Sequence, residues 1–94
     1  MTRSTLETAI RNKRVIMFTY KYSLRTVEPH LLGISNTGVL TLSAYQLLGG
    51  SGQGWRDFHI GKIHGITTTG QSFVQPRLGY NPFDTTMSQI LARV

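Results

Sequence analysis

The stretch Arg25-Thr-Val-Glu-Pro-His30 decides the fold, and the apolar run Leu31-Leu-Gly-Ile34 follows it directly. Proline has no N–H to donate to a neighbouring strand, so Pro29 fits a strand edge or a bend. We therefore expect a strand from Leu24 to Ile34 that bends at Pro29 beside a barrel-like core. Glu28 is one of only four acidic residues in the chain, and it needs a partner if the bend buries it.

Four other segments have the β-branched and aromatic composition that is typical of strands. They are Val15–Tyr20, Val39–Tyr45, Trp55–Ile60 and His64–Thr69, and turn residues separate them. The glycine-rich segment Gly49–Gly54 lacks the spacing of a phosphate-binding loop and precedes a strand rather than a helix. We interpret it as a flexible hairpin loop.

Helical patterns mark both ends of the chain. Ser4-Thr-Leu-Glu7 has the form of a capping box, which predicts a short helix from about Thr5 to Asn12. Near the other end, apolar residues recur at helical spacing after an N-cap at Asp84. They are Met87, Ile90, Leu91 and Val94. This terminal helix is expected either to cover the barrel or to pair with another subunit.

These elements predict a mainly β fold, a small five-stranded barrel of the Sm-like or SH3-like kind with a short N-terminal helix. We assign the barrel and its helix to residues 1–70. Residues 71–94 form a C-terminal extension, in which a turn segment rich in Pro and Gly precedes the short amphipathic helix.

The composition fits one soluble domain of 94 residues. The chain has no cysteine, no apolar run approaching the roughly 18 residues of a membrane helix, and no signal-peptide pattern. We therefore expect a cytoplasmic protein without membrane partners. The net charge of +6 fits either a phosphate-bearing partner or simple charge-based solubility, so the placement of the charges has to decide.

Three segments in order resemble the WYL domain family. They are Arg25-x-Val-Glu-Pro-His30, Leu40-Thr-Leu-Ser-Ala-Tyr45 and Trp55-Arg-x-Phe-His-Ile-x-Lys-Ile63. In that family they read as Arg-x-Val-Glu-Pro, Trp-Tyr-Leu-x-Ala-Tyr and Arg-x-Phe-Arg-Leu-Asp-Arg-Ile. The resemblance covers roughly Leu6 to Ile66, about two thirds of the chain. It implies an Sm-like barrel that serves bacterial transcription regulators as a ligand-sensing or nucleic-acid-binding module.

The chain departs from the WYL pattern at several positions. Leu40 and Thr41 stand where the family has Trp and Tyr, which removes two rings that a ligand could stack on. Arg56 matches the first arginine of the third segment, whereas His59 and Lys62 replace the other two. WYL domains usually follow a winged helix, and the chain starts only a few residues before the predicted helix, so direct readout of duplex DNA is not expected.

The candidate ligand surface is cationic and partly aromatic. It consists of Arg25, Tyr45, Arg56, His59 and Lys62. Arginine and lysine bind phosphates, and a tyrosine ring can stack a base. Glu28 and His30 are expected to support this surface structurally, with Glu28 paired to Arg25 or Arg56. Since Arg56 and His59 point to opposite faces of a regular strand, a single surface requires a twist or a bulge.

Two functions remain open on these grounds. The first is a regulatory module that binds single-stranded nucleic acid, a nucleotide or another phosphorylated ligand. The alternative is an interaction module that forms a homodimer or joins a separate DNA-binding subunit through the terminal helix. Catalysis, metals and cofactors are not expected, because the chain has no P-loop, GxSxG or HExxH motif, and His59 and His64 make a poor metal pair.

Overall fold

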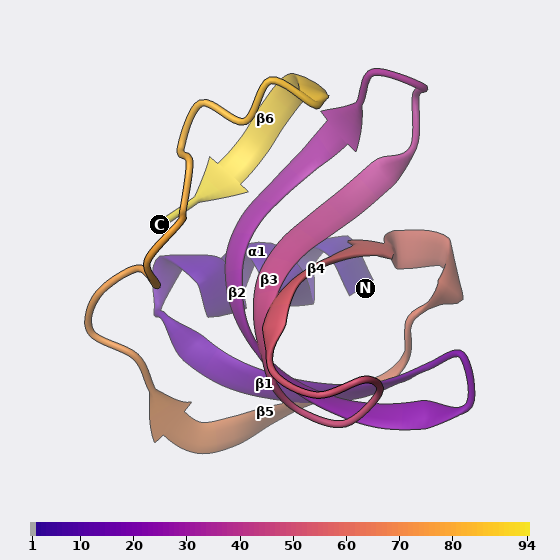
Figure 1. Cartoon of the computed structure of the whole chain (residues 1–94), viewed down its shortest axis with the longest axis vertical. Coiled ribbons are helices and arrows are strands. Elements are labelled where there is room, and N and C mark those ends of the chain that lie inside the picture. Colours follow the sequence, from indigo (N-terminus) through magenta and orange to yellow (C-terminus); the bar gives the residue numbers. More distant parts are fainter. Residues whose placement is uncertain (1) are drawn as a thin grey trace.

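The computed structural model describes residues 2–94 as one antiparallel sheet of six strands with one short α-helix (Figure 1). The elements in chain order are α1 (Thr2–Arg11), β1 (Arg14–Tyr20), β2 (Ser23–Ser35), β3 (Leu40–Leu48), β4 (Gly54–His59), the 3-10 helix η1 (Ile60–Lys62), β5 (His64–Ser72) and β6 (Met87–Arg93). The predicted mainly β class and N-terminal helix are confirmed.

The predicted closed barrel of five strands is wrong. The strand order is β4-β3-β2-β1-β5, so β4 and β5 are the two ends of an open path, and β6 adds a sixth strand to β2. The 3-10 helix η1 links the two end strands along the chain without bringing them into a ladder with each other.

Strand β2 is the centre of the sheet, and its bend lies where the sequence predicts it. Its first half pairs with β1 up to Ile16↔Val27, and its second half pairs with β6 from Leu31↔Arg93 onward. Pro29 falls between these two ladders and pairs with β3 alone, with a register shift immediately after it. A central strand therefore tolerates the proline, because no strand on the other side needs its missing N–H.

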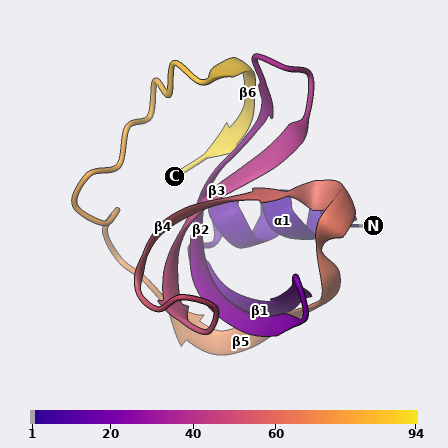
Figure 2. The ribbon, with the colours of Figure 1, turned by 45° about the vertical axis from the view of Figure 1, so that its right-hand side comes forward.

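The concave side of the sheet encloses the apolar core. Leu6, Ala9 and Ile10 of α1 are buried against alternate residues of β1 to β4, including Phe18 and Phe58, whose rings meet edge to face at 5.0 Å. Figure 2 shows α1 lying across the opening of the curved sheet. The helix spans Thr2–Arg11, so Ser4 lies inside it rather than at the predicted cap, and Glu7 pairs with Arg3 at 3.4 Å.

The predicted C-terminal helix is wrong, because Met87–Arg93 is strand β6. Two irregularities in its ladder with β2 explain the error. Leu91 is an extra residue between the pairs Leu32↔Ala92 and Gly33↔Ile90, and a second shift occurs next to Ser88. Each bulge lengthens the alternation of a strand by one residue, so the apolar positions take on helix-like spacing.

Residues 73–86 connect β5 to β6, and we call this segment the strap. It contains no helix or strand and runs along the sheet on the left of Figure 2, away from α1. Its partners are the polar and aromatic side chains of β2, β3 and β4 that face away from the core. The structure has no helix that is long and apolar enough to cross a membrane in the described residues.

Candidate functional site

Glu28 pairs with the strap rather than with another strand. Its carboxylate accepts hydrogen bonds from Arg77 Nε at 2.8 Å and Arg77 Nη2 at 3.2 Å, and its side chain is only 7% exposed. The same guanidinium lies 4.6 Å from the ring centre of Tyr45. The prediction that Glu28 pairs with Arg25 or Arg56 is therefore wrong. The buried carboxylate fastens the strap to the sheet instead.

His30 is fully buried, and one ring nitrogen bonds to the strap while the other bonds to its own strand. The backbone N–H of Arg77 donates to His30 Nε2 at 3.1 Å, so Nδ1 carries the ring hydrogen and donates to the Glu28 carbonyl at 2.7 Å. Burial lowers the pKa of His30, outweighing the nearby Glu28 charge that raises it. The imidazole is therefore neutral, in the Nδ1–H tautomer.

Aromatic rings surround this imidazole. Phe73 stacks on it at 5.0 Å, Trp55 meets it edge-on at 4.8 Å, and Tyr80 lies at 5.3 Å. Trp55 also donates from Nε1 to the Leu78 carbonyl at 3.0 Å. We call the set Glu28, His30, Tyr45, Trp55, Phe73, Arg77 and Tyr80 the strap cluster. The rings and charges of this cluster pair with one another, which leaves them little capacity for a ligand.

Arg25 is also committed to internal bonds. It donates from Nη1 to Gln46 Oε1 at 3.0 Å and from Nη2 to the Tyr20 carbonyl at 3.1 Å, over the rings of Tyr20 and Phe58. Gln46 in turn is fully buried and donates to the carbonyls of Gly49 and Gly52. These bonds close the glycine loop, which confirms its interpretation as a hairpin loop.

Arg56 belongs to the same loop. Its Nη1 donates to the Trp55 carbonyl at 2.9 Å, and its Nη2 donates to Ser51 Oγ at 2.8 Å. Its Nη2 also reaches the Gly52 carbonyl at 3.3 Å. The guanidinium is therefore occupied by neutral oxygens of the loop. This arrangement stabilises the turn between β3 and β4 and leaves few of the guanidinium N–H donors free to bind a phosphate.

The remaining two predicted ligand residues are exposed. His59 lies at the end of β4, where its backbone N–H donates to the Tyr20 hydroxyl at 3.2 Å. Its imidazole is close enough to Asp57 to act on the pKa of that carboxyl, which burial raises above its ordinary value. An acidic neighbour makes His59 a poor phosphate ligand. Lys62, at the end of η1, has no ion-pair partner among residues 2–94.

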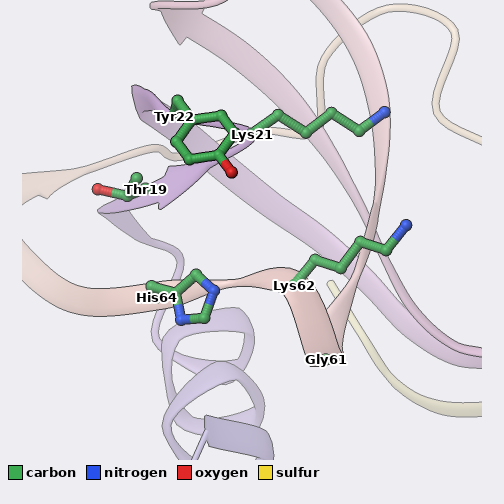
Figure 3. Close-up of a pocket in the computed structure, with 6 residues that line it drawn as sticks. All are labelled: Thr19, Lys21, Tyr22, Gly61, Lys62 and His64. Carbon is green, nitrogen blue, oxygen red and sulfur yellow. The ribbon is translucent and has the colours of Figure 1, made fainter.

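Lys62 lines a surface depression of about 290 Å³ that was not among the predicted sites. The other lining residues are Thr19, Lys21, Tyr22, Gly61 and His64. Figure 3 shows Lys21 and Tyr22 on one side and the Gly61–His64 segment on the other, with both lysine side chains extending in the same direction. The lining contains two ammonium groups, an imidazole and a phenol, and it contains no carboxylate.

The topology explains why these residues meet. Lys21 and Tyr22 form the two-residue turn between β1 and β2, and Thr19 pairs with His64 on the neighbouring strand β5. The 3-10 turn at η1 brings Lys62 to the same end of the sheet. Lys21 and Tyr22 have φ values of 50° and 62°, a conformation that costs a non-glycine residue about 1 kcal/mol or more.

The structure therefore separates the predicted surface into two parts. Arg25, Tyr45 and Arg56 are held in internal contacts, whereas Lys62 joins a new basic depression, and His59 lies beside an acid. The signal for the new site was present in the sequence, since a two-residue turn usually contains Asn or Gly rather than Lys and Tyr. Comparison with protein-family models, curated proteins and solved structures finds no match to this chain.

Proposed function

We propose that this chain is a WYL-like binding module for a phosphate-bearing ligand, either single-stranded nucleic acid or a nucleotide. The ligand binds at the depression lined by Lys21, Lys62 and His64. The observation that carries this proposal is that two lysines and a histidine line one hollow whose lining contains no acidic side chain. The proposed ligand surface therefore contains Lys21 and Lys62 in place of the predicted Arg25 and Arg56. No described carboxylate forms an ion pair with either lysine.

Lysine suits this task when the ligand is a flexible anion. Its ammonium is a mobile point charge with three donors, whereas a guanidinium works best in a fixed, planar pairing. The chain uses its two kinds of cation accordingly: the forks of Arg25, Arg56 and Arg77 bind fixed oxygens of the protein. The net charge of +6 adds a long-range attraction for anions that is strongest at low salt.

The alternative function, an interaction module, drew its motivation from a C-terminal helix. Residues Met87–Arg93 instead form β6 and bond to β2 of the same chain, and Asn36 further fixes the start of that strand through its bonds to Thr85 and Thr86. One edge of this segment is therefore already paired within the chain. Among the described residues no carboxylate pairs with Lys21 or Lys62, and Lys21 Nζ lies 5.8 Å from the ring centre of Tyr20. The unpaired charges of the two lysines favour the ligand-binding proposal.

Fluorescence anisotropy with labelled single-stranded DNA and RNA oligonucleotides, at about 20, 50 and 150 mM salt, tests the proposal. We expect binding at low salt that weakens steeply as salt rises, because phosphate contacts release counterions. Lys62→Ala and Lys21→Gln should each weaken binding about tenfold and reduce the salt slope by about one.

Arg11→Ala is the matched control, since Arg11 is an exposed cation at the end of α1, before the start of β1, whereas the depression lies beyond the end of β1. It removes the same charge and should change affinity by less than about threefold at the highest of these salt concentrations, where screening weakens distant charges. Absence of binding at the lowest salt concentration, or equal losses in all three variants, would contradict the proposal.

A further inference from the structure

The turn between β1 and β2 places a large side chain where the backbone favours the smallest one. Lys21 and Tyr22 both have left-handed φ values, 50° and 62°. Two-residue turns of this kind usually carry Asn-Gly or Gly-Gly, because glycine reaches positive φ without a clash at Cβ. A tyrosine at the second position is therefore unfavourable for the fold, and its presence there calls for another reason.

The Tyr22 side chain does not stabilise the fold through any described hydrogen bond or ring contact. Its side chain is fully exposed, at 105% of the reference area, and it makes no hydrogen bond or ring contact with another described residue. Tyr20 and Tyr80, by comparison, pack against Phe58 and Trp55. Tyr22 instead stands over the depression, with its hydroxyl directed toward the space between the turn and the Gly61–His64 segment (Figure 3).

We propose that Tyr22 is a specificity-determining residue, a stacking platform that selects an unpaired base while Lys21 and Lys62 hold neighbouring backbone phosphates. This inference rests on the proposed function and narrows its ligand to a single strand. An exposed phenol ring offers a face to any unstacked base. A duplex offers no such base, since its bases are already stacked. A nucleoside monophosphate offers a base but only one phosphate for the two lysines.

The strain at Tyr22 makes the inference testable with a variant that should fold at least as well as the natural chain. Tyr22→Gly removes the ring and relieves the left-handed backbone, so we expect an unchanged or higher melting temperature. Its affinity for a labelled oligothymidine should fall about tenfold, which is the loss expected for one stacked base. The salt slope should stay unchanged, because the phosphate contacts remain.

Tyr22→Phe provides the matched control, since it keeps the ring and the backbone cost and loses only the hydroxyl. We expect it to retain the affinity of the natural chain within about twofold. The preference for the single strand over a duplex of the same sequence should persist in Tyr22→Phe and largely disappear in Tyr22→Gly, because stacking on the platform requires an unpaired base.

The outcomes separate this inference from the proposed function. If Lys62→Ala weakens binding while Tyr22→Gly leaves the affinity unchanged, the phosphate site stands and the platform is refuted. A melting temperature that falls by several degrees in Tyr22→Gly would also overturn it, since the ring would then serve the fold. If the natural chain binds no oligonucleotide at low salt, the proposed function itself fails.

Discussion

The arginines Arg25, Arg56 and Arg77 differ from the lysines Lys21 and Lys62 in whether their charge is already used within the fold. Each of the three guanidiniums makes at least two hydrogen bonds to a carbonyl, an amide, a hydroxyl or the Glu28 carboxylate. Neither lysine makes an ion pair with a described residue. On the sequence, all five residues contribute equally to the same net charge of +6.

The difference shows that a basic residue at a family-like position is not by itself a ligand residue. Arg56 matches the arginine of the WYL pattern and is nevertheless bound to the loop that precedes it. The planar guanidinium can satisfy several fixed acceptors at once, so it is well suited to closing loops and fastening straps. The predictions below test this separation between structural arginines and ligand-binding lysines.

The largest effect should come from the centre of the strap cluster. His30→Ala removes a fully buried ring, leaves a cavity against Phe73 and Trp55, and deprives the Arg77 N–H of its acceptor. We expect a loss of about 3 kcal/mol in the free energy of unfolding, measured by urea denaturation. The melting temperature should fall by roughly 12–24 °C.

Oligonucleotide affinity should stay unchanged in this variant at a temperature where it remains folded, because the depression lies at the end of β1, outside the strap cluster. A parallel loss of affinity under those conditions would contradict the division between structural and ligand-binding residues, since the strap cluster would then contribute to binding.

A smaller effect should distinguish two substitutions that remove the same charge. Arg56→Ala deletes two hydrogen bonds to the glycine loop and one to the Trp55 carbonyl, and because these oxygens can be rehydrated, we expect a loss of about 1 kcal/mol in the free energy of unfolding. Lys62→Ala should change stability by less than about 0.5 kcal/mol, as for most exposed residues. Thermal melts of the two variants at one pH, together with the anisotropy titration, measure both quantities.

The expected result is a crossed pattern, in which Arg56→Ala loses stability and keeps its affinity, while Lys62→Ala does the reverse. An Arg56→Ala protein that melts normally but binds poorly would restore Arg56 to the ligand surface and remove the distinction between the two kinds of cation.

The parts of the fold that were predictable from the sequence are those whose signals are local. Strands β1 to β5 carry β-branched and aromatic runs between turn residues, and the bend at Pro29 follows from its missing N–H. Strand β6 was mistaken for a helix because bulges next to Ser88 and at Leu91 stretch the apolar spacing. A bulge depends on the partner strand, and single-sequence periodicity contains no information about that partner.

The site was less predictable, because its contacts join residues far apart in the chain. Glu28 needed a cationic partner. Arg77 lies 49 residues downstream in a segment without regular structure, whereas Arg25 and Arg56 are nearer in the sequence. The lysine depression depends on the pairing of β1 with β5, which brings the turn to η1. The Lys-Tyr turn is its only local signal, since two-residue turns usually contain Asn or Gly.

The smallest effect expected is a pH dependence of the strap, since it involves a single buried imidazole. Burial lowers the pKa of His30 from its ordinary value of 6.5, so the unfolded chain binds more protons than the folded chain between the lowered value and 6.5. The free energy of unfolding should therefore fall as the pH drops through this window. Among the groups that face the ring, Glu28 favours the added proton and Arg77 opposes it, while burial raises the pKa of the Tyr80 phenol and keeps it neutral in this window.

The raised pKa of Asp57 acts with the opposite sign, because the folded chain binds more protons above the ordinary value of 3.8. His30→Gln isolates the imidazole, since its amide can donate and accept as the Nδ1–H tautomer does but cannot titrate. Urea denaturation at pH 7.5 and pH 5.0 should show a larger acid-induced loss in the natural chain than in His30→Gln. Equal losses in both proteins would mean that the strap is fastened independently of the protonation state of His30.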